Sequence, residues 1–295
     1  MEVKRIFVVG AGLMGAGIAE VAARAGYEVA LQDLTEDLVK KGYARIEKDL
    51  TKQVEKGKLS AEEMQSTLGR VKLATDLKPA AEADLVIEAI IEDAGAKKEL
   101  FKKLDEICPP QTILASNTSS IPITELAAAI KRADKFIGMH FFSPVPVMKL
   151  VEIIKGLKTS EETAAVIRDV VEKLGKVGVM VKDSPGFLVN RVNAALRSEV
   201  YRCLEEGVAS IEDIDKALKF GLNHPMGPFE LQDNVGLDIG LAVFQTLYDN
   251  FKDPKWAPAL SLKKLVAAGD LGKKTGKGWY DYTSGEKKVR TDLNL

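Results

Sequence analysis

The 295-residue chain is poor in cysteine and histidine, with two residues of each. Cys108 and Cys203 are isolated, with no Cys-x-x-Cys pair and no histidine at metal-ligand spacing, so we predict neither a disulfide framework nor a metal site. We expect both thiols to be buried, reduced and inert. Only His140 and His224 remain as histidines that could exchange protons near neutral pH.

The sequence also lacks an excess of either charge and any long apolar run. Its 42 basic and 43 acidic residues give a formal net charge of −1, which offers no general attraction to nucleic acid or anionic membranes, so we expect neither partner. No apolar run approaches the roughly 20 residues of a membrane-spanning helix, and the chain starts directly with a core strand, without room for a signal peptide. We therefore expect a cytoplasmic protein with one large core or two domains.

What the sequence does contain is a strand, a glycine-rich turn, a helix, a second strand and an acid, in that order, between residues 6 and 33. Gly10 permits the tight turn, Gly12 lets the backbone approach a pyrophosphate, and Gly15 lets the helix pack closely. The helix begins at about Leu13, and its first residues, Leu13 and Met14, lie at the diphosphate. The free N–H groups of this turn and the positive end of the helix dipole point at the diphosphate. These five residues predict a dinucleotide site.

Asp33 ends the second strand, where a carboxylate would accept hydrogen bonds from the adenosine ribose. A 2′-phosphate would meet a negative charge there, so we predict NAD rather than NADP as the cofactor. The alternative is a glycine-rich turn without function, because a lone motif of this kind is weak evidence. The flanking strands, the helix and the acid all fit the cofactor site.

Apolar strands and helical segments alternate to about residue 180, which is typical of a mostly parallel, doubly wound α/β sheet. After the first strand-helix-strand unit we expect strands at 71–74, 84–90, 112–115, 136–142, 150–154 and 177–181. We expect helices at 36–56, 96–107, 123–130 and 160–174. A further short helix should start at the capping-box sequence of residues 60–63. Asp183-Ser184-Pro185-Gly186 breaks this pattern. Beyond it we expect an all-helical domain with helices near 188–206, 211–220, 229–251 and 260–268, giving domains 1–183 and 184–295.

His140 ends an apolar strand, at the sheet edge where open α/β sheets bind ligands. Glu152 lies in the otherwise apolar strand Leu150-Val151-Glu152-Ile153-Ile154, and a buried carboxylate needs a partner. We predict a pair in which Glu152 fixes the tautomer of His140 and favours its imidazolium form. The alternative is a core histidine with a structural hydrogen bond. His224 lies in a turn-forming segment and is expected to be structural.

Two polar groups could complete the site. Residues 115–120 (ASNTSS) follow a strand and would place Ser119 and its neighbours at the same edge as His140, although some of these side chains could be helix caps. Asn190 follows the Pro185-Gly186 break and could reach across a cleft between the domains. The turn GKKTGKGWY at 272–280 would be a surface loop if it stood alone.

Taken together, these residues resemble the short-chain L-3-hydroxyacyl-CoA dehydrogenase family, and most closely its bacterial 3-hydroxybutyryl-CoA branch. The resemblance runs over nearly the whole chain, through GAGLMGAGIA, SNTSSIPIT, HFFSPVPVMKLVEII, DSPGFLVNR, HPMGPFEL and KTGKGWYDY. It implies NAD-dependent oxidation of a 3-hydroxyacyl-CoA, or the reverse reduction, by a homodimer formed through the helical domain.

Carried over position by position, the resemblance implies a role for each matching residue. His140 would be the catalytic acid/base with Glu152 as its orienting partner, and Ser119 and Asn190 would hold the reacting oxygen or thioester region. Further residues are implied to bind the cofactor (Glu92, Lys97, Ser119 and Ser143) or the CoA phosphates (Lys52 and Lys56). The two lysines, four apart, share one helix face, although an ordinary solvated face explains them nearly as well.

The chain departs from the family pattern at Ser143 and Asp93, where the family commonly has Asn. Ser143 can donate and accept a hydrogen bond but reaches less far than Asn, and Asp93 adds a negative charge if it faces the cleft. Two other readings compete with the acyl-CoA dehydrogenase. One is an NAD-dependent dehydrogenase of a free hydroxy acid, like the L-gulonate dehydrogenase and lambda-crystallin branch. The other is a non-catalytic NAD-binding protein, which the presence of both His140 and Glu152 disfavours.

Overall fold

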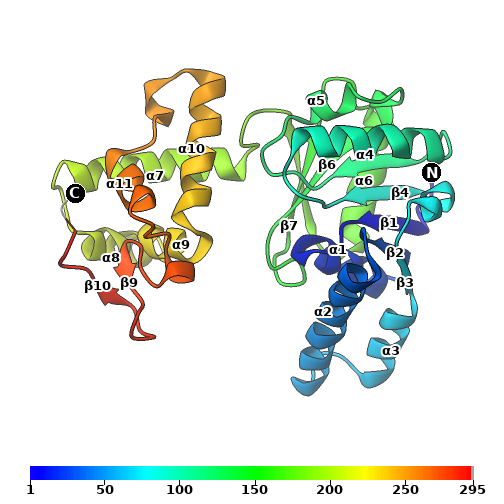
Figure 1. The fold of residues 1–295 in the computed structure, drawn as a ribbon, viewed down its shortest axis with the longest axis horizontal. Helices are drawn as coiled ribbons and strands as arrows, with labels where there is room; N and C mark the ends of the chain where they lie inside the picture. Colours follow the sequence, from blue (N-terminus) through cyan, green and yellow to red (C-terminus); the bar gives the residue numbers. More distant parts are fainter. Residues whose placement is uncertain (294–295) are drawn as a thin grey trace. The chain divides into compact units, whose positions relative to one another are not determined.

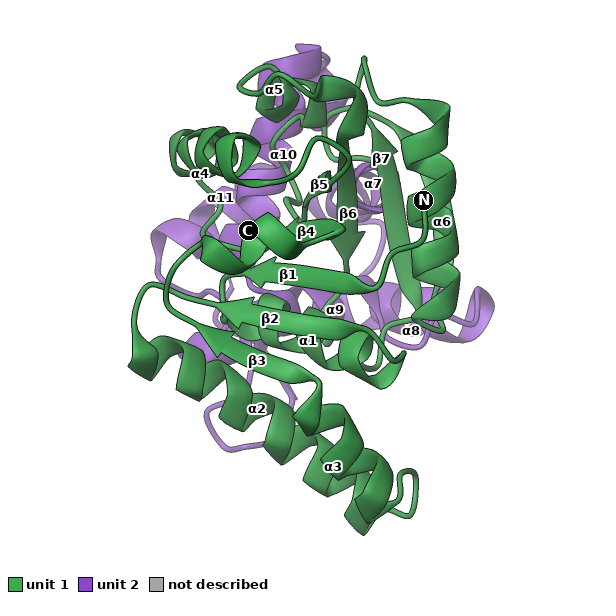
Figure 2. Cartoon of the chain, turned by 90° about the vertical axis from the view of Figure 1, so that its right-hand side faces the viewer, with its two compact units in different colours: residues 1–187 green, residues 188–295 purple. Residues whose placement is uncertain are grey.

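The computed structural model describes residues 1–293, and the chain forms two compact units, Met1–Phe187 and Leu188–Leu295. Figure 2 shows the first unit in green and the second in purple. The division falls just after the Pro185-Gly186 break, a few residues beyond the expected boundary at 183/184. Each unit has its own hydrophobic core.

Unit 1 contains an eight-stranded sheet in the order β3-β2-β1-β4-β5-β6-β7-β8, of which Figure 2 labels β1 to β7. All neighbouring pairs are parallel except β6 and β7, which run antiparallel. The strands are β1 (Arg5–Val9), β2 (Glu28–Gln32), β3 (Val71–Ala74), β4 (Leu85–Glu88), β5 (Ile113–Ser116), β6 (Phe136–Phe141), β7 (Leu150–Lys155) and β8 (Val177–Lys182). The predicted doubly wound, mostly parallel sheet is confirmed.

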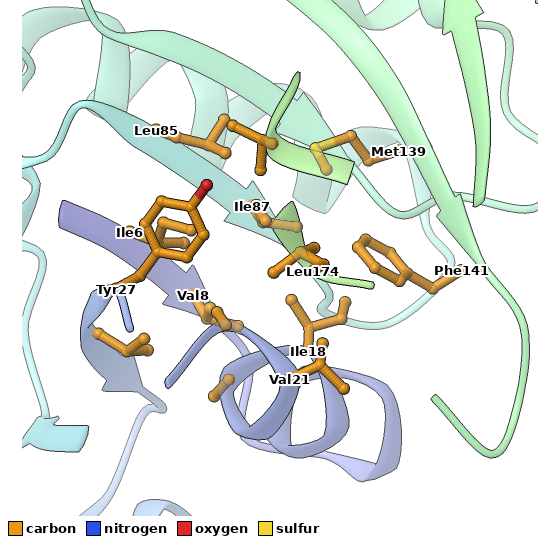
Figure 3. Close-up of a cluster of buried hydrophobic side chains, with 14 of the residues drawn as sticks. Ile6, Val8, Ile18, Val21, Tyr27, Leu85, Ile87, Met139, Phe141 and Leu174 are labelled. Atoms are coloured by element: carbon orange, nitrogen blue, oxygen red, sulfur yellow. The ribbon is translucent and has the colours of Figure 1, made fainter. Parts of the chain in front are cut away.

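Helices cover both faces of the sheet because successive strand residues point to opposite sides. In β1, Ile6 and Val8 join one hydrophobic cluster, whereas Phe7 and Val9 join another. The first cluster, shown in part in Figure 3, includes side chains of α1 (Leu13–Arg24), α2 (Glu36–Glu55), α3 (Ala61–Gly69) and α6 (Glu161–Lys173). The second includes side chains of α4 (Ala94–Ile107), α5 (Ile123–Ala127) and the 3-10 helix η1 (Lys78–Glu82). A further 3-10 turn, η2 (Ala133–Lys135), precedes β6.

Several of these helices begin where a hydroxyl side chain caps the first turn. Thr35, Ser60 and Ser160 each accept a hydrogen bond from the backbone N–H three residues later. Ser60 and Glu63 form both hydrogen bonds of the predicted capping box, which starts α3.

Unit 2 is built mainly from α7 (Val189–Glu205), α8 (Ile211–Gly221), α9 (Pro228–Val235), α10 (Leu237–Phe251) and α11 (Leu260–Ala267), with the 3-10 helices η3 (Pro254–Trp256) and η4 (Lys273–Thr275) (Figure 1). The prediction of one helix over 229–251 is wrong. Gly236, with φ of +111°, separates α9 from α10, and this left-handed backbone conformation is one that glycine adopts readily.

The C-terminal part of unit 2 is more ordered than a surface loop. The short strands β9 (Tyr280–Asp281) and β10 (Lys288–Val289) pair antiparallel, which the sequence did not predict. The carboxylate of Asp233 accepts hydrogen bonds from the backbone N–H groups of Trp279 and Tyr280, each at 2.9 Å. These bonds anchor the glycine- and lysine-rich turn and hold Trp279 in the core.

The two cysteines differ in their surroundings. Cys108 is buried, and burial raises the pKa of its thiol to about 11, whereas Cys203 is partly exposed. The expected burial therefore holds for Cys108 only. Within residues 1–293, no helix is both long and apolar enough to cross a membrane.

Candidate functional site

The glycine-rich turn at the carboxyl end of β1 has the geometry that its spacing predicts. Gly10 has a φ of +101°, and a Cβ there would lie 2.5 Å from the carbonyl oxygen of Ala89. A Cβ on Gly15 would lie 1.7 Å from the carbonyl oxygen of Gly10, so any side chain would push the helix from the turn. In contrast, a Cβ on Gly12 would meet no atom within 4 Å. The space above Gly12 is therefore open to a ligand.

The start of α1 fits an anionic group. Its first turn has no acidic residue, and no side chain caps it, so its backbone N–H groups are free of side-chain partners. Asp33, directly after β2, accepts hydrogen bonds from the N–H of Ala11 at 2.8 Å and from that of Leu34 at 2.7 Å. The carboxylate is thereby held beside the turn. These residues fit the diphosphate and the adenosine ribose of NAD.

His140 and Glu152 lie directly opposite each other in the antiparallel pair of β6 and β7. The Nδ1 atom of His140 is 2.7 Å from Oε2 of Glu152, and both side chains are buried. The imidazole also lies 4.6 Å from the ring of Phe142 and 5.6 Å from that of Phe187, measured between centroids. With Nδ1 engaged by the carboxylate, Nε2 is the nitrogen available for proton exchange with a ligand.

The polar segment after β5 is hydrogen-bonded to β6 on one side and to the loop after β4 on the other. The side-chain oxygen of Asn117 accepts a hydrogen bond from the N–H of Phe141, next to His140, at 2.9 Å. Ser119 is exposed, and its N–H donates to Oε1 of Glu92 at 2.9 Å. None of the hydroxyls in this segment caps α5. Instead, the carboxylate of Asp183 accepts hydrogen bonds from the N–H groups that begin this helix, at 123 and 124.

Glu92 and Lys97 lie at this edge and contact each other. The Nζ atom of Lys97 is 3.3 Å from Oε2 of Glu92, and Lys97 is only 1% exposed. Burial would raise the pKa of Glu92, but the hydrogen bond from Thr118 and the charge of Lys97 lower it below its ordinary value. Glu92 therefore holds the loop that carries Ser119.

Sequence reasoning missed Glu88, which is completely buried at the end of β4. Its carboxylate accepts hydrogen bonds from Nζ of Lys97 at 2.5 Å, from Oγ of Ser116 at 2.6 Å and from the N–H of Ile90 at 2.7 Å. The signal was present, because Glu88 is an acid in an otherwise apolar strand, as Glu152 is.

The two lysines implied to face CoA differ in position. Lys52 lies on α2 and lines a hollow of about 320 Å³ together with Leu13, Arg45 and Asp49. Lys56 caps the end of α2 and is exposed. Further residues around the hollow include Gly17, Glu20, Lys48 and the loop at 144–146.

The other predicted site residues are placed as follows. Ser143 is exposed two residues beyond the end of β6, and Asn190 is the second residue of α7 in unit 2. Asp93, one of the departures from the family pattern, caps α4 by accepting a hydrogen bond from the N–H of Ala96 at 2.7 Å. His224 lies in the turn between α8 and α9. Within residues 1–293, no cluster of three or more His, Cys, Asp or Glu side chains could hold a metal ion.

The sheet order, the open glycine turn and the carboxylate after β2 define a dinucleotide-binding protein of the NAD type. Comparison with protein families identifies it further. Residues 5–184 match the family model described as 3-hydroxyacyl-CoA dehydrogenase, NAD binding domain, and residues 186–282 match that of the 3-hydroxyacyl-CoA dehydrogenase C-terminal domain. The chain belongs to the 3-hydroxyacyl-CoA dehydrogenase family, and the resemblance seen in the sequence is confirmed.

Relatives match over almost the full chain. A probable 3-hydroxybutyryl-CoA dehydrogenase of Bacillus subtilis is 51% identical over 282 residues, which cover 96% of this chain and 98% of that protein. The human mitochondrial hydroxyacyl-coenzyme A dehydrogenase is 47% identical, covering 95% of this chain and 91% of its own. The crystal structure of (S)-3-hydroxybutyryl-CoA dehydrogenase from Ralstonia eutropha matches with a TM-score of 0.94 and 46% identity, over 96% of this chain and 100% of that one.

Proposed function

We propose that this protein catalyses the NAD-dependent oxidation of (S)-3-hydroxyacyl-CoA to 3-oxoacyl-CoA, and the reverse reduction, with 3-hydroxybutyryl-CoA as the substrate. The observation that carries this proposal is the 2.7 Å contact between His140 and Glu152 at the carboxyl edge of a sheet with an open dinucleotide turn. The four-carbon substrate is supported by the names of the bacterial relatives, which cover nearly the whole chain.

When bound, NAD supplies the acceptor for the hydride that leaves C3 of the substrate. The protein supplies the proton acceptor and the positioning. Nε2 of His140 takes the proton of the 3-hydroxyl, and Glu152 at Nδ1 holds the tautomer and stabilises the imidazolium that forms. In the reduction, the same nitrogen returns the proton to the 3-oxo group. Because Glu152 is buried and engaged before substrate binds, the ring needs no reorientation for this step.

Further residues would bind the two ligands. Gly12 and the first turn of α1 would take the diphosphate of NAD, while Asp33 would select NAD over NADP. Ser119 and Asn190 would orient the substrate oxygen. Lys52 and Lys56 would meet the CoA phosphates. For Lys52, support comes from the hollow that it lines, where Arg45 and Lys48 are further cations beside the acids Glu20 and Asp49.

We also propose that residues 1–183 bind NAD, that residues 184–295 complete the substrate cleft and form a homodimer, and that the protein works in the cytoplasm. The dimer is supported by large apolar side chains that unit 2 exposes, among them Val192, Phe220, Leu222 and Leu260. Multi-angle light scattering tests it, with a particle of about twice the monomer mass expected. A monomer at micromolar concentration would contradict it.

The test of the catalytic assignment uses the two histidines as a matched pair. His140→Gln should lower kcat for acetoacetyl-CoA reduction about 10²- to 10⁴-fold while NADH affinity is retained. His224→Gln should stay within about twofold of the natural protein, because His224 lies outside the proposed site. Near-full turnover of His140→Gln would refute the assignment. Free acetoacetate and L-gulonate, assayed beside acetoacetyl-CoA, show whether the thioester is required.

A further inference from the structure

Buried polar groups at the ends of β4 and β5 form a closed ring of contacts. On one side of the ring, Glu88 accepts hydrogen bonds from Nζ of Lys97 at 2.5 Å and from Oγ of Ser116 at 2.6 Å. On the other side, Oγ of Ser116 accepts from the N–H of Thr118 at 3.2 Å, and Oγ1 of Thr118 donates to Glu92 at 2.6 Å. Glu92 closes the ring, with Oε2 at 3.3 Å from Nζ of Lys97.

The ring holds two carboxylates and one ammonium group, so its charged groups leave one negative charge uncompensated. Glu88, Lys97, Ser116 and Thr118 are all at most 1% exposed, and Glu92 is the member that reaches the surface. Charges in such surroundings interact more strongly than they do in water, because the local dielectric response is weaker. A positive group bound beside the ring would therefore gain stabilisation, and a neutral group of the same shape would not.

The position of the ring indicates which part of a bound cofactor would lie beside it. Residues at the end of β4 contact the glycine turn, since a Cβ on Gly10 would lie 2.5 Å from Ala89 O and 3.1 Å from Ile90 N. On the other side, Asn117 links the end of β5 to β6 beside His140. The ring thus lies between the turn that fits a diphosphate and the imidazole that exchanges the proton. A dinucleotide that spans this edge places its nicotinamide riboside there.

Oxidised nicotinamide carries a positive charge, and reduced nicotinamide is neutral. We propose that Glu88 is a positioning residue which fixes Lys97 and, through the extra negative charge it adds to the ring, makes this site discriminate between oxidised and reduced cofactor. Without Glu88, Lys97 and Glu92 would form a neutral pair. This inference rests on the proposed binding of NAD, and it adds a residue that senses the redox state of the cofactor.

The test measures the dissociation constants of NAD⁺ and NADH for the full-length protein by isothermal titration calorimetry. Glu88→Gln keeps the size of the side chain and removes its charge. We expect the ratio of the NAD⁺ constant to the NADH constant to rise about 3- to 10-fold, because only the oxidised form loses an attraction. Glu92→Gln should also raise this ratio. Because Glu92 is the exposed member of the ring, this variant provides the test if Glu88→Gln does not fold.

Two matched variants separate charge from packing. Glu82→Gln removes the same charge from the last residue of η1, just before the amino end of β4, where Glu82 is exposed beside Arg5, and should leave the ratio unchanged. Ser116→Ala removes a hydrogen bond to Glu88 without changing charge, and should also leave it unchanged. An unchanged ratio in a folded Glu88→Gln variant overturns the inference, and so does an equal rise in Ser116→Ala. If Glu88→Gln does not fold, an unchanged ratio in Glu92→Gln overturns it. Failure of the natural protein to bind either cofactor would instead refute the proposed function.

Discussion

Replacing Glu20 by glutamine should make the protein more stable than the natural chain at neutral and alkaline pH. Glu20 lies on α1 and is only 2% exposed. Burial, together with the nearby charge of Asp49, raises the pKa of its carboxyl group to about 8. Gln53 donates hydrogen bonds to both acids, at 3.2 Å to Glu20 and 2.7 Å to Asp49. A glutamine at position 20 has the shape and the donor of the protonated acid.

The expected magnitude follows from the two pKa values. The unfolded chain releases the proton of Glu20 near pH 4.5, whereas the folded chain keeps it until about pH 8. Between these values the folded state binds more protons, so the stability contributed by this group falls as the pH rises. Each pH unit corresponds to about 1.4 kcal/mol. The difference in unfolding free energy between the variant and the natural chain should therefore increase by about 3 to 4 kcal/mol, in favour of the variant, when the pH is raised from 5 to 8.

Urea denaturation followed by far-UV circular dichroism at several pH values measures this difference. Because the chain has two compact units, hydrogen exchange of peptides from α1 should report unit 1 by itself. Glu47→Gln, at an exposed position on α2, is the matched control and should leave the pH dependence unchanged. Parallel stability curves for Glu20→Gln and the natural chain from pH 5 to pH 8 would refute the reasoning.

Further changes test other parts of the molecule. Asp33→Ala should raise the kcat/KM for NADPH relative to NADH about tenfold or more, and an unchanged ratio would show that Asp33 does not contact the ribose. Gly12→Ala should keep the melting temperature but weaken NAD binding, whereas Gly15→Ala should lower the melting temperature, because only the second Cβ meets an atom of the turn. Equal melting temperatures would contradict this. A thiol reagent at pH 8 should modify Cys203 before Cys108, which is buried and has a pKa of about 11; mass spectrometry of the modified peptides gives the order.

The features that could be predicted from the sequence are those set by neighbours along the chain. The turn at Gly10, the capping box at Ser60 and the alternation of strands and helices each depend on a few adjacent residues, and all are present in the structure. The contact of His140 with Glu152 was predictable for a different reason. A lone acid in an apolar strand needs a partner, and one histidine ended the preceding strand.

Other features depend on contacts that local patterns do not reveal. The apolar periodicity of α9 continues into α10, so the break at Gly236 is visible only through its backbone conformation. The strands of the C-terminal hairpin have two residues each, too few for an alternating pattern. Glu88, like Glu152, is an acid in an otherwise apolar strand. Its partner Lys97 could not be singled out, because α4 contains several charged residues.

The strand pairing of β6 with β7 also bears on how this protein could diversify. Because His140 and Glu152 are cross-strand neighbours, the backbone ladder keeps them together, whatever the length of the eight-residue connection at 142–149. Exposed positions of that connection, such as Val147, can change without separating His140 from Glu152. A slip of the ladder by a single position, in contrast, would turn the acid to the other side of the sheet. Substitutions at such exposed positions should therefore disturb the pair less than substitutions in either strand.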